Sequence, residues 1–174
     1  MNGLAYLSTG LGIIIVDLNR NEVRDTWIIG NNGSQVKVNG FTRDNNFIYA
    51  ATEQGLKIAS LQSSNLADYR NWNLISGTNN LPTGSCKNVI TVGNSIAIQK
   101  GDSILIQNGN SWQLLYHDAA WPITNITSTD NRISVSQRTI TGAARVLLMN
   151  ISGVIERTLT QSGVISLPLS AILD

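Results

Sequence analysis

Short runs of β-branched and aliphatic residues alternate along the chain with clusters of Asn, Asp and Gly. No window keeps apolar residues at positions i, i+3, i+4 and i+7 over successive turns, as an amphipathic helix requires. Strand-length runs separated by Asn/Gly turns predict an all-β sandwich, barrel or propeller. The clearest predicted strands are residues 11–18, 25–29, 35–39, 47–51, 56–60, 88–92, 95–99, 103–107 and 112–116.

A repeated four-strand unit decides among these architectures. Each unit opens with a strand, a tight polar or glycine turn and a second strand, and the units start near residues 4, 47, 95 and 132. Starts that lie roughly 37 to 48 residues apart have the spacing of propeller blades. The sequence therefore predicts an all-β, β-propeller-type fold with four four-stranded antiparallel blades. We expect residues 1–174 to form a single segment of a larger propeller.

The strands of a blade are called a to d here, from the inner to the outer edge. Strand a ends in an Asx-rich turn and leads into b, a polar turn, c and finally d. Because blades pack face to face, we expect their inner strands to be buried on both faces. The side chains predicted to be buried are those of Ile13, Ile15, Ile48, Ile58, Ile96, Ile104, Ile106, Val146 and Leu148.

The order of the strands predicts how the ring closes. The chain starts with a b strand, residues 4–8, and ends with an a strand, residues 164–173. The fourth blade would therefore be built from both ends. Three outcomes remain open: closure within one chain, exchange of terminal strands between two chains, and an open arc with exposed edges that associates. We favour a homo-oligomer over the closed monomer because an open arc leaves apolar blade faces bare.

The four tryptophans fall into two groups. Trp27, Trp72 and Trp112 recur at one place in the repeat, in or near strand d, which predicts that they pack between blades. Trp121 lies outside the repeat, in a d–a loop before Pro122. An aromatic side chain on a loop is a candidate platform for a sugar ring or a peptide.

Composition excludes several classes of function. With 12 Lys+Arg against 11 Asp+Glu the net charge is +1, which argues against a nucleic-acid binder. A single cysteine and a single histidine leave no disulfide framework and no metal cluster, and we expect Cys86 to be a small buried residue. No phosphate loop is present, so no cofactor is expected. No apolar run is long enough to insert into a membrane, and we expect no signal peptide within this segment.

The acidic residues and the histidine offer little catalytic chemistry. Asp17 with Asp25, and Asp102 with Asp118, are the only carboxylates expected to approach one another, and they are expected to be turn residues. His117 precedes Asp118, but no nucleophile elbow lies near it. We therefore expect no catalytic residues and no enzymatic activity.

A motif connects the first two units to a known family. The strings Tyr6-Leu-Ser-Thr-Gly-Leu-Gly-Ile13 and Tyr49-Ala-Ala-Thr-Glu-Gln-Gly-Leu56 resemble the two-component regulator propeller repeat. The third and fourth units carry only degenerate versions of this motif. Residues 6–30 are more specifically similar to the N-terminal propeller of PorZ-like proteins, surface proteins of Bacteroidetes linked to type IX secretion. This resemblance implies an extracytoplasmic, non-catalytic module at the cell surface or in the periplasm.

These observations predict a non-enzymatic recognition or scaffold module of a bacterial envelope protein, either a sensor propeller or a secretion-associated one. In a propeller the d–a and b–c loops share one face at the channel mouth. A protein or glycan ligand is expected there, in contact with Trp121, His117, Asn79 or Glu53. The alternative is a polysaccharide lyase or glycosidase, which would gather carboxylates, His117 and Arg or Lys at that mouth.

Overall fold

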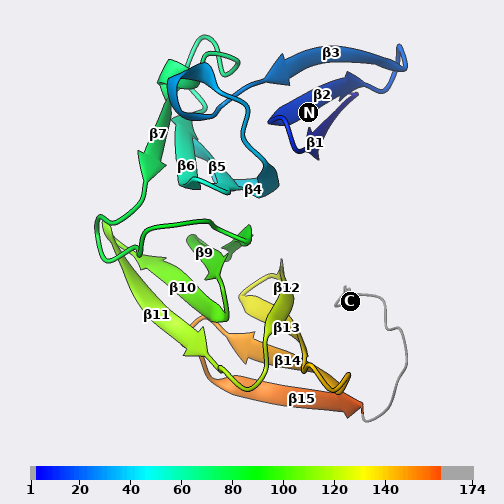
Figure 1. The fold of residues 1–174 in the computed structure, drawn as a ribbon, viewed down its shortest axis with the longest axis vertical. Coiled ribbons are helices and arrows are strands. Elements are labelled where there is room, and N and C mark those ends of the chain that lie inside the picture. The colour runs from blue at the N-terminus through cyan, green and yellow to red at the C-terminus, as the bar shows by residue number, and fades with distance from the viewer. Residues whose placement is uncertain (1–2, 162–174) are drawn as a thin grey trace. The chain divides into compact units, whose positions relative to one another are not determined.

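The computed structural model describes residues 3–161 as antiparallel β-sheets joined by short turns (Figure 1). The first sheet contains β1 (Leu4–Ser8), β2 (Ile13–Asp17) and β3 (Glu22–Trp27), and the second contains β4 (Val38–Arg43), β5 (Phe47–Thr52), β6 (Gly55–Ser60) and β7 (Trp72–Ile75). The third contains β8 (Asn88–Val92), β9 (Ser95–Lys100), β10 (Ser103–Asn108) and β11 (Ser111–His117), and the fourth β12 (Ile123–Thr129), β13 (Arg132–Arg138), β14 (Ala144–Asn150) and β15 (Ile155–Gln161). Two single-turn 3₁₀ helices, η1 (Asn31–Gly33) and η2 (Tyr69–Asn71), lie in loops.

The predicted all-β fold with a repeating blade is confirmed. The four b strands begin at Leu4, Phe47, Ser95 and Arg132, as the repeat predicts. In the second to fourth sheets the strands follow one another in the order a, b, c, d, each antiparallel to the next. The first sheet has three strands within the described part of the chain, and the strand predicted to complete it, residues 164–173, lies outside the described residues.

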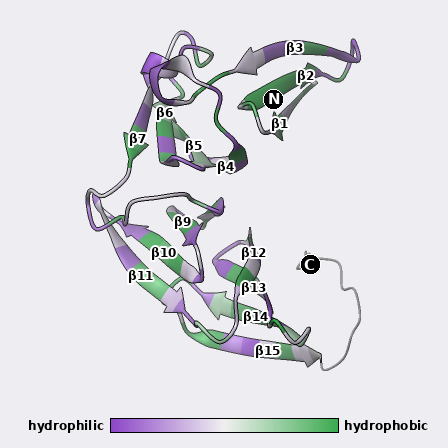
Figure 2. Cartoon of the chain, viewed as in Figure 1, coloured by the Kyte–Doolittle hydropathy of each residue, from purple (hydrophilic) through white to green (hydrophobic). Residues whose placement is uncertain are grey.

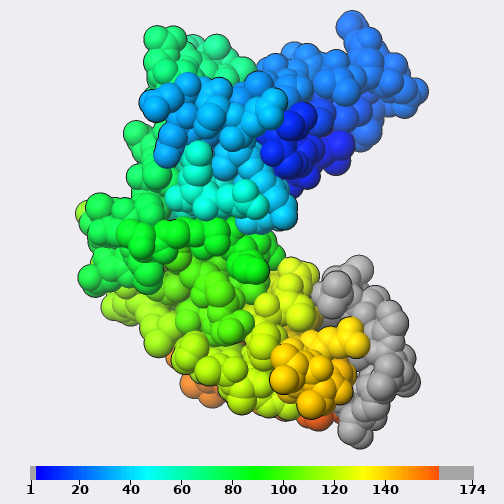
Figure 3. Space-filling model, in the orientation of Figure 1, coloured from blue at the N-terminus to red at the C-terminus, as the bar shows by residue number. Residues whose placement is uncertain are grey.

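The chain divides into two compact units, Met1–Lys87 and Asn88–Asp174 (Figure 3). Unit 1 contains the first and second sheets, and unit 2 the third and fourth. In Figure 3 the residues of unit 1 are coloured from blue to green, and the described residues of unit 2 from green to orange. That the whole chain forms one propeller segment stays a prediction.

Each unit has its own apolar core, which follows from the alternation of side chains along the strands (Figure 2). In unit 1, Ile13 and Ile15 of β2 pack with Ile48 of β5. In unit 2, Ile133 of β13 and Ile104 of β10 belong to one buried cluster. Cys86 is fully buried, as predicted.

Most of the predicted buried positions are confirmed, but three are only partly buried. Ile58, Val146 and Leu148 are of intermediate exposure, whereas the other six are buried. In β14 the buried side chains are Leu147 and Met149. Neighbouring residues of a strand face opposite sides, and the third sheet covers only the Leu147 face within unit 2. The prediction therefore chose the wrong face of β14.

The motif shared by the first two units is a hydroxyl-braced turn between strands b and c. Thr9 and Thr52 donate their hydroxyls to the carbonyls of Gly12 and Gly55 at 2.9 and 2.7 Å. Each threonine oxygen also accepts a backbone N–H two residues ahead. Gly12 has φ of 145°, and a Cβ there would lie 2.1 Å from the carbonyl oxygen of Trp27. This explains why the motif requires both threonine and glycine.

The three repeated tryptophans are buried, but they do not occupy one structural position. Trp72 and Trp112 lie near the start of strand d, opposite Ala59 and Gln107. Trp27 lies at the end of β3, opposite Ile13. The predicted equivalence of Trp27 is therefore wrong, because β3 begins earlier, at Glu22, than the predicted strand. Packing between blades is nevertheless confirmed in unit 1, where the Trp27 and Trp72 ring centroids lie 6.3 Å apart.

Candidate functional site

In unit 2 the loop that joins β11 to β12 lies against two b–c turns. The backbone N–H of Ile123 donates to the Asp102 carboxylate at 3.3 Å, which connects the loop to the β9–β10 turn. The N–H of Arg138 donates to the Pro122 carbonyl at 3.1 Å, which connects it to the β13–β14 hairpin. The d–a and b–c loops of this unit therefore lie at a common edge, as expected of propeller blades.

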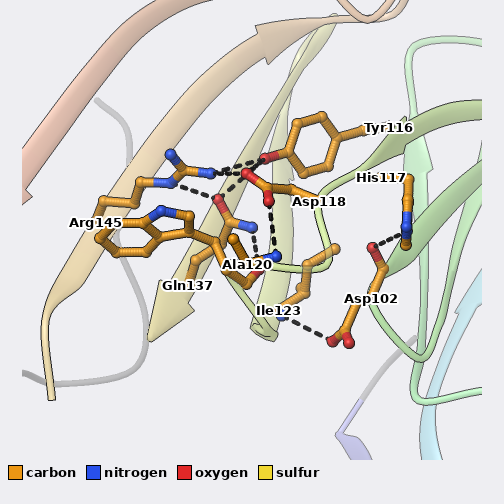
Figure 4. Close-up of polar contacts among 9 residues, drawn as sticks. Asp102, Tyr116, His117, Asp118, Ala120, Ile123, Gln137 and Arg145 are labelled. Carbon is orange, nitrogen blue, oxygen red and sulfur yellow. Dashed lines mark hydrogen bonds and ion pairs between the residues drawn. The ribbon is translucent and has the colours of Figure 1, made fainter. Parts of the chain in front are cut away.

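A polar cluster centred on Arg145 of β14 supports this loop (Figure 4). The guanidinium forms an ion pair with Asp118 at 2.5 Å and donates to the Tyr116 hydroxyl at 3.0 Å. Its Nε donates to Oε1 of Gln137 at 2.8 Å. The Arg145 and Asp118 side chains are only 18% and 28% exposed. Because planar donors and acceptors meet in a fixed geometry, this cluster holds the loop rigidly.

Trp121 is held by the same cluster. Its indole ring lies under the guanidinium of Arg145, with 4.3 Å from the guanidinium carbon to the ring centroid. The Gln137 amide donates to the Trp121 carbonyl, and the Trp121 N–H donates to the Asp118 carbonyl at 3.3 Å. The indole is half-buried. The loop aromatic singled out from the sequence is therefore held by Arg145 and Gln137, which the sequence analysis did not name, and by Asp118, which it named only as an expected turn residue.

The charge of Asp118 is retained to low pH. Partial burial acts to raise its pKa, but the hydrogen bonds from Arg145, Ala120 and Tyr116 outweigh it and hold the pKa below the ordinary value. The carboxylate therefore neutralises Arg145 and has no proton to donate near neutral pH. This chemistry fits a structural ion pair and does not fit a general acid.

His117 is exposed and lies apart from any arrangement of triad type. Its Nδ1 lies 3.1 Å from the Ser103 hydroxyl and 3.2 Å from the backbone carbonyl of Asp102. The Asp102 carboxylate bonds to the N–H of Ile123 instead of to the imidazole (Figure 4). A catalytic triad needs a carboxylate to orient the imidazole, so this contact does not form one.

The two candidate residues of unit 1 lie in different loops. Glu53 is exposed in the β5–β6 turn, and its N–H donates to the Lys37 carbonyl at 3.2 Å. Asn79 is exposed in the β7–β8 connection with φ of 52°. Within unit 2, His117 and Trp121 lie at the two ends of one loop. The assignment of all four residues to a ligand stays a prediction.

Sequence analysis also missed a buried cation in unit 1. Lys57 of β6 is 2% exposed, and its ammonium donates to Oδ1 of Asn31 in η1 at 2.9 Å. The Asn31 N–H in turn donates to Oε1 of Gln54 at 3.0 Å. Burial lowers the pKa of Lys57. The sequence offers one indication of this buried cation, because Lys57 is the only charged residue in the apolar strand β6.

Of the first carboxylate pair, Asp17 lies at the end of β2 beside the turn, as expected, whereas Asp25 lies within β3 and is not a turn residue. Asp17 accepts the N–H groups of Asn19 and Arg20 in the β2–β3 turn. Asp25 accepts the indole N–H of Trp27 at 3.0 Å. Within residues 3–161 no group of three or more His, Cys, Asp or Glu side chains is placed to hold a metal ion. In the same range no helix is long and apolar enough to cross a membrane.

Repeated antiparallel sheets, together with d–a and b–c loops that meet at one edge in unit 2, define a protein of the β-propeller type. Residues 1–73 match the family model described as the PorZ N-terminal β-propeller domain of the type IX secretion system. The resemblance of the opening segment to PorZ-like propellers is thereby confirmed. A search of curated proteins finds no match.

Solved structures show the same fold. PorZ, described as an essential bacterial surface component of the type IX secretion system of Porphyromonas gingivalis, matches with a TM-score of 0.65 and 21% identity over 92% of this chain and 20% of its own. The extracellular domain of a one-component system protein from B. thetaiotaomicron matches with a TM-score of 0.65 and 13% identity over 90% of this chain and 21% of its own. AztD from Citrobacter koseri matches with a TM-score of 0.51 and 15% identity, over 93% and 44%. The chain thus spans about a fifth of the first two proteins.

Proposed function

We propose that this chain is a non-enzymatic recognition or scaffold module of a bacterial envelope protein, related to secretion-associated or sensor propellers. The match of residues 1–73 to the PorZ propeller and the fold shared with an extracellular sensor domain support this proposal. These relatives are described as a surface component and an extracellular domain, which supports a location in the periplasm or at the cell surface.

The observation that carries the recognition role is the rigid Trp121 loop. The indole is half-buried, and Arg145, Gln137 and Asp118 all hold the loop that carries it. Building an aromatic side chain onto a preorganised loop lowers the entropy cost of binding. The ligand is a protein or a glycan, and the residues that we expect it to contact are Trp121, His117, Asn79 or Glu53.

The bonding of the polar cluster supports a binding role over the enzyme alternative. A glycosidase needs one carboxyl group with a raised pKa, and the pKa of Asp118 is lowered. The Asp102 carboxylate bonds to a backbone N–H, and the imidazole of His117 is exposed. The carboxylates of Asp102 and Asp118 therefore form hydrogen bonds and an ion pair that hold the loop in place.

A binding screen tests the proposal. The chain is applied to glycan and peptide arrays, and each hit is titrated with Trp121→Ala alone and combined with Asn79→Ala. Loss of binding is expected for these variants. Leu114→Ala is the matched control, because Leu114 is 64% exposed on β11 and lies outside the loops. Binding that survives the double variant would contradict the proposal.

We also propose that copies of the chain associate through their terminal strands. β1 is the end strand of its sheet within the described part of the chain, and Leu7 and Val23 of the same sheet are 48% and 63% exposed. Exposed apolar side chains on an unpaired sheet favour association. Light scattering with size exclusion tests this, since a clean 18.8 kDa monomer removes the proposal.

A further inference from the structure

Unit 1 contains an apolar cavity between its two sheets. Its volume is about 240 Å³. Tyr6 of β1, Trp27 of β3 and Phe41 of β4 line it with three aromatic rings. The Tyr6 ring packs edge-on against both neighbours, with centroids 5.6 Å from Trp27 and 6.2 Å from Phe41. The wall of the cavity therefore combines aromatic side chains from three strands.

Aliphatic side chains complete this wall. Ile48 of β5 is buried, and Leu61 and Leu66 come from the connection between β6 and β7. Tyr6, Phe41 and the two leucines pack as partly buried side chains against the apolar core of unit 1. The cavity therefore lies on that core, and close packing holds its lining side chains in place.

The volume of the cavity limits the size of a ligand. A cavity of roughly 150 Å³ lined by Leu, Ile and Phe binds benzene. Pockets that enclose drug-sized molecules begin at about 300 Å³. At about 240 Å³ this cavity lies between the two and suits a compound of one or two fused rings.

The lining favours a neutral ligand. Besides the aromatic and aliphatic residues it contains Thr42 and Arg43, and both already have an interaction partner in the structure. No Asp or Glu is among the lining residues in the described part of the chain, so a cation would meet no counter-charge. Moving an unpaired charge from water into an apolar site costs free energy, which disfavours ionised ligands of either sign.

We propose that this cavity binds a small neutral aromatic compound. The ring of the ligand lies among Tyr6, Trp27 and Phe41. Aromatic side chains prefer edge-to-face or offset contacts with another ring, and such contacts add to the gain from burying apolar area. The cavity is a second ligand site of the chain, and it does not depend on the role proposed for Trp121.

Titration of the whole chain with 2-naphthol at pH 7 tests the proposal. Two comparison ligands keep its ring skeleton: 2-naphthoate adds a charge, and decahydro-2-naphthol lacks aromatic rings. Calorimetry should show that 2-naphthol binds at least roughly tenfold more tightly than 2-naphthoate, because the charge must be desolvated. It should bind roughly two- to tenfold more tightly than decahydro-2-naphthol, because only an aromatic ligand gains the ring contacts.

Two leucine variants and one resonance locate the ligand. Leu66→Trp fills part of the cavity and should remove measurable binding of 2-naphthol. Leu74→Trp is the matched control, because Leu74 is 39% exposed on β7 and is not among the lining residues, and it should leave the affinity unchanged. The indole N–H resonance of Trp27 should shift during the titration, and that of Trp121 should stay in place.

The ligand series on the unchanged chain keeps the test independent of whether a variant folds. No binding of 2-naphthol, or equal or tighter binding of either comparison ligand, would overturn the proposal. The same holds for equal affinities of the two leucine variants, and for a titration that moves the Trp121 resonance and leaves that of Trp27 in place.

Discussion

The two units bring a cation to comparable places in their sheets but give it different partners. In unit 1, Lys57 lies on the third strand of the second sheet and reaches Asn31 in the loop before that sheet. In unit 2, Arg145 lies on the third strand of the fourth sheet and reaches Asp118 in the loop before it. The lysine meets a neutral amide, whereas the arginine meets a carboxylate.

This difference determines what each loop offers. A buried ammonium bonded to an amide has given up water without gaining a counter-charge, so it costs free energy. The guanidinium is compensated by Asp118, and its flat surface also covers the indole of Trp121. Unit 2 therefore combines a neutralised cation with an aromatic side chain that the cation holds in place. In unit 2 the cation therefore holds the loop in place, because Arg145 contacts both Asp118 and Trp121 of that loop.

The largest expected effect comes from the turns, where the units also differ. Gly12→Ala forces a side chain against the Trp27 carbonyl at a φ of 145°, which should cost about 3 kcal/mol or more of unfolding free energy. In unit 2 a Cβ on Gly101, at φ of 56°, would meet nothing within 4 Å. Gly101→Ala should therefore cost about 1 kcal/mol. Urea denaturation measures both, and equal losses would contradict the different roles of the two turns.

The next effect tests the compensated cation. Arg145→Leu leaves a partly buried Asp118 without its counter-charge, and we expect a loss of roughly 2 kcal/mol in unfolding free energy. Trp121 should become more accessible to acrylamide quenching. Arg132→Leu is the control, because the Arg132–Glu156 pair is exposed, and no measurable change is expected. Similar losses in the two variants would show that burial of the Arg145 pair contributes nothing.

Replacing the uncompensated cation should have the opposite sign. Lys57→Met removes a buried ammonium and keeps the volume, so a gain of about 1 kcal/mol at pH 7 is expected. The lowered pKa of Lys57 means that the unfolded chain holds this proton more tightly. Wild-type stability should therefore rise relative to Lys57→Met as pH increases through the folded pKa toward 10.5. A difference in unfolding free energy between the two proteins that stays constant from pH 7 to pH 10.5 would contradict a lowered pKa of Lys57.

The smallest effect lies at acid pH. Because the pKa of Asp118 is lowered in the fold, its contribution is complete above 3.8 and is lost as the pH falls through the folded pKa. Asp118→Asn should remove that dependence. Thermal unfolding of both proteins at pH 6 and pH 2 checks this, and the wild type should lose more Tm on acidification. The same loss in both would assign the acid sensitivity to other carboxylates.

Much of the fold could be predicted because it repeats. The starts of the four b strands and the threonine-glycine turn depend on local chemistry that recurs in the sequence. Side-chain placement was harder. Trp27 occupies a different register from Trp72 because β3 begins earlier than predicted, and Val146 faces the opposite side of β14 from Leu147. A shift of one residue reverses the face of a strand, and local pattern alone does not determine it.

The class of fold, the blade period and the loop that carries Trp121 depend on neighbours along the chain, so the amino-acid pattern is enough to predict them. The packing of the sheets, by contrast, places Arg145 against Trp121, Asp118 against Arg145 and Lys57 against an amide. It also brings Tyr6, Phe41 and Arg43 to the lining of one cavity. These contacts join residues that are distant in the sequence, and the sheets bring them together only when the strands pair and pack.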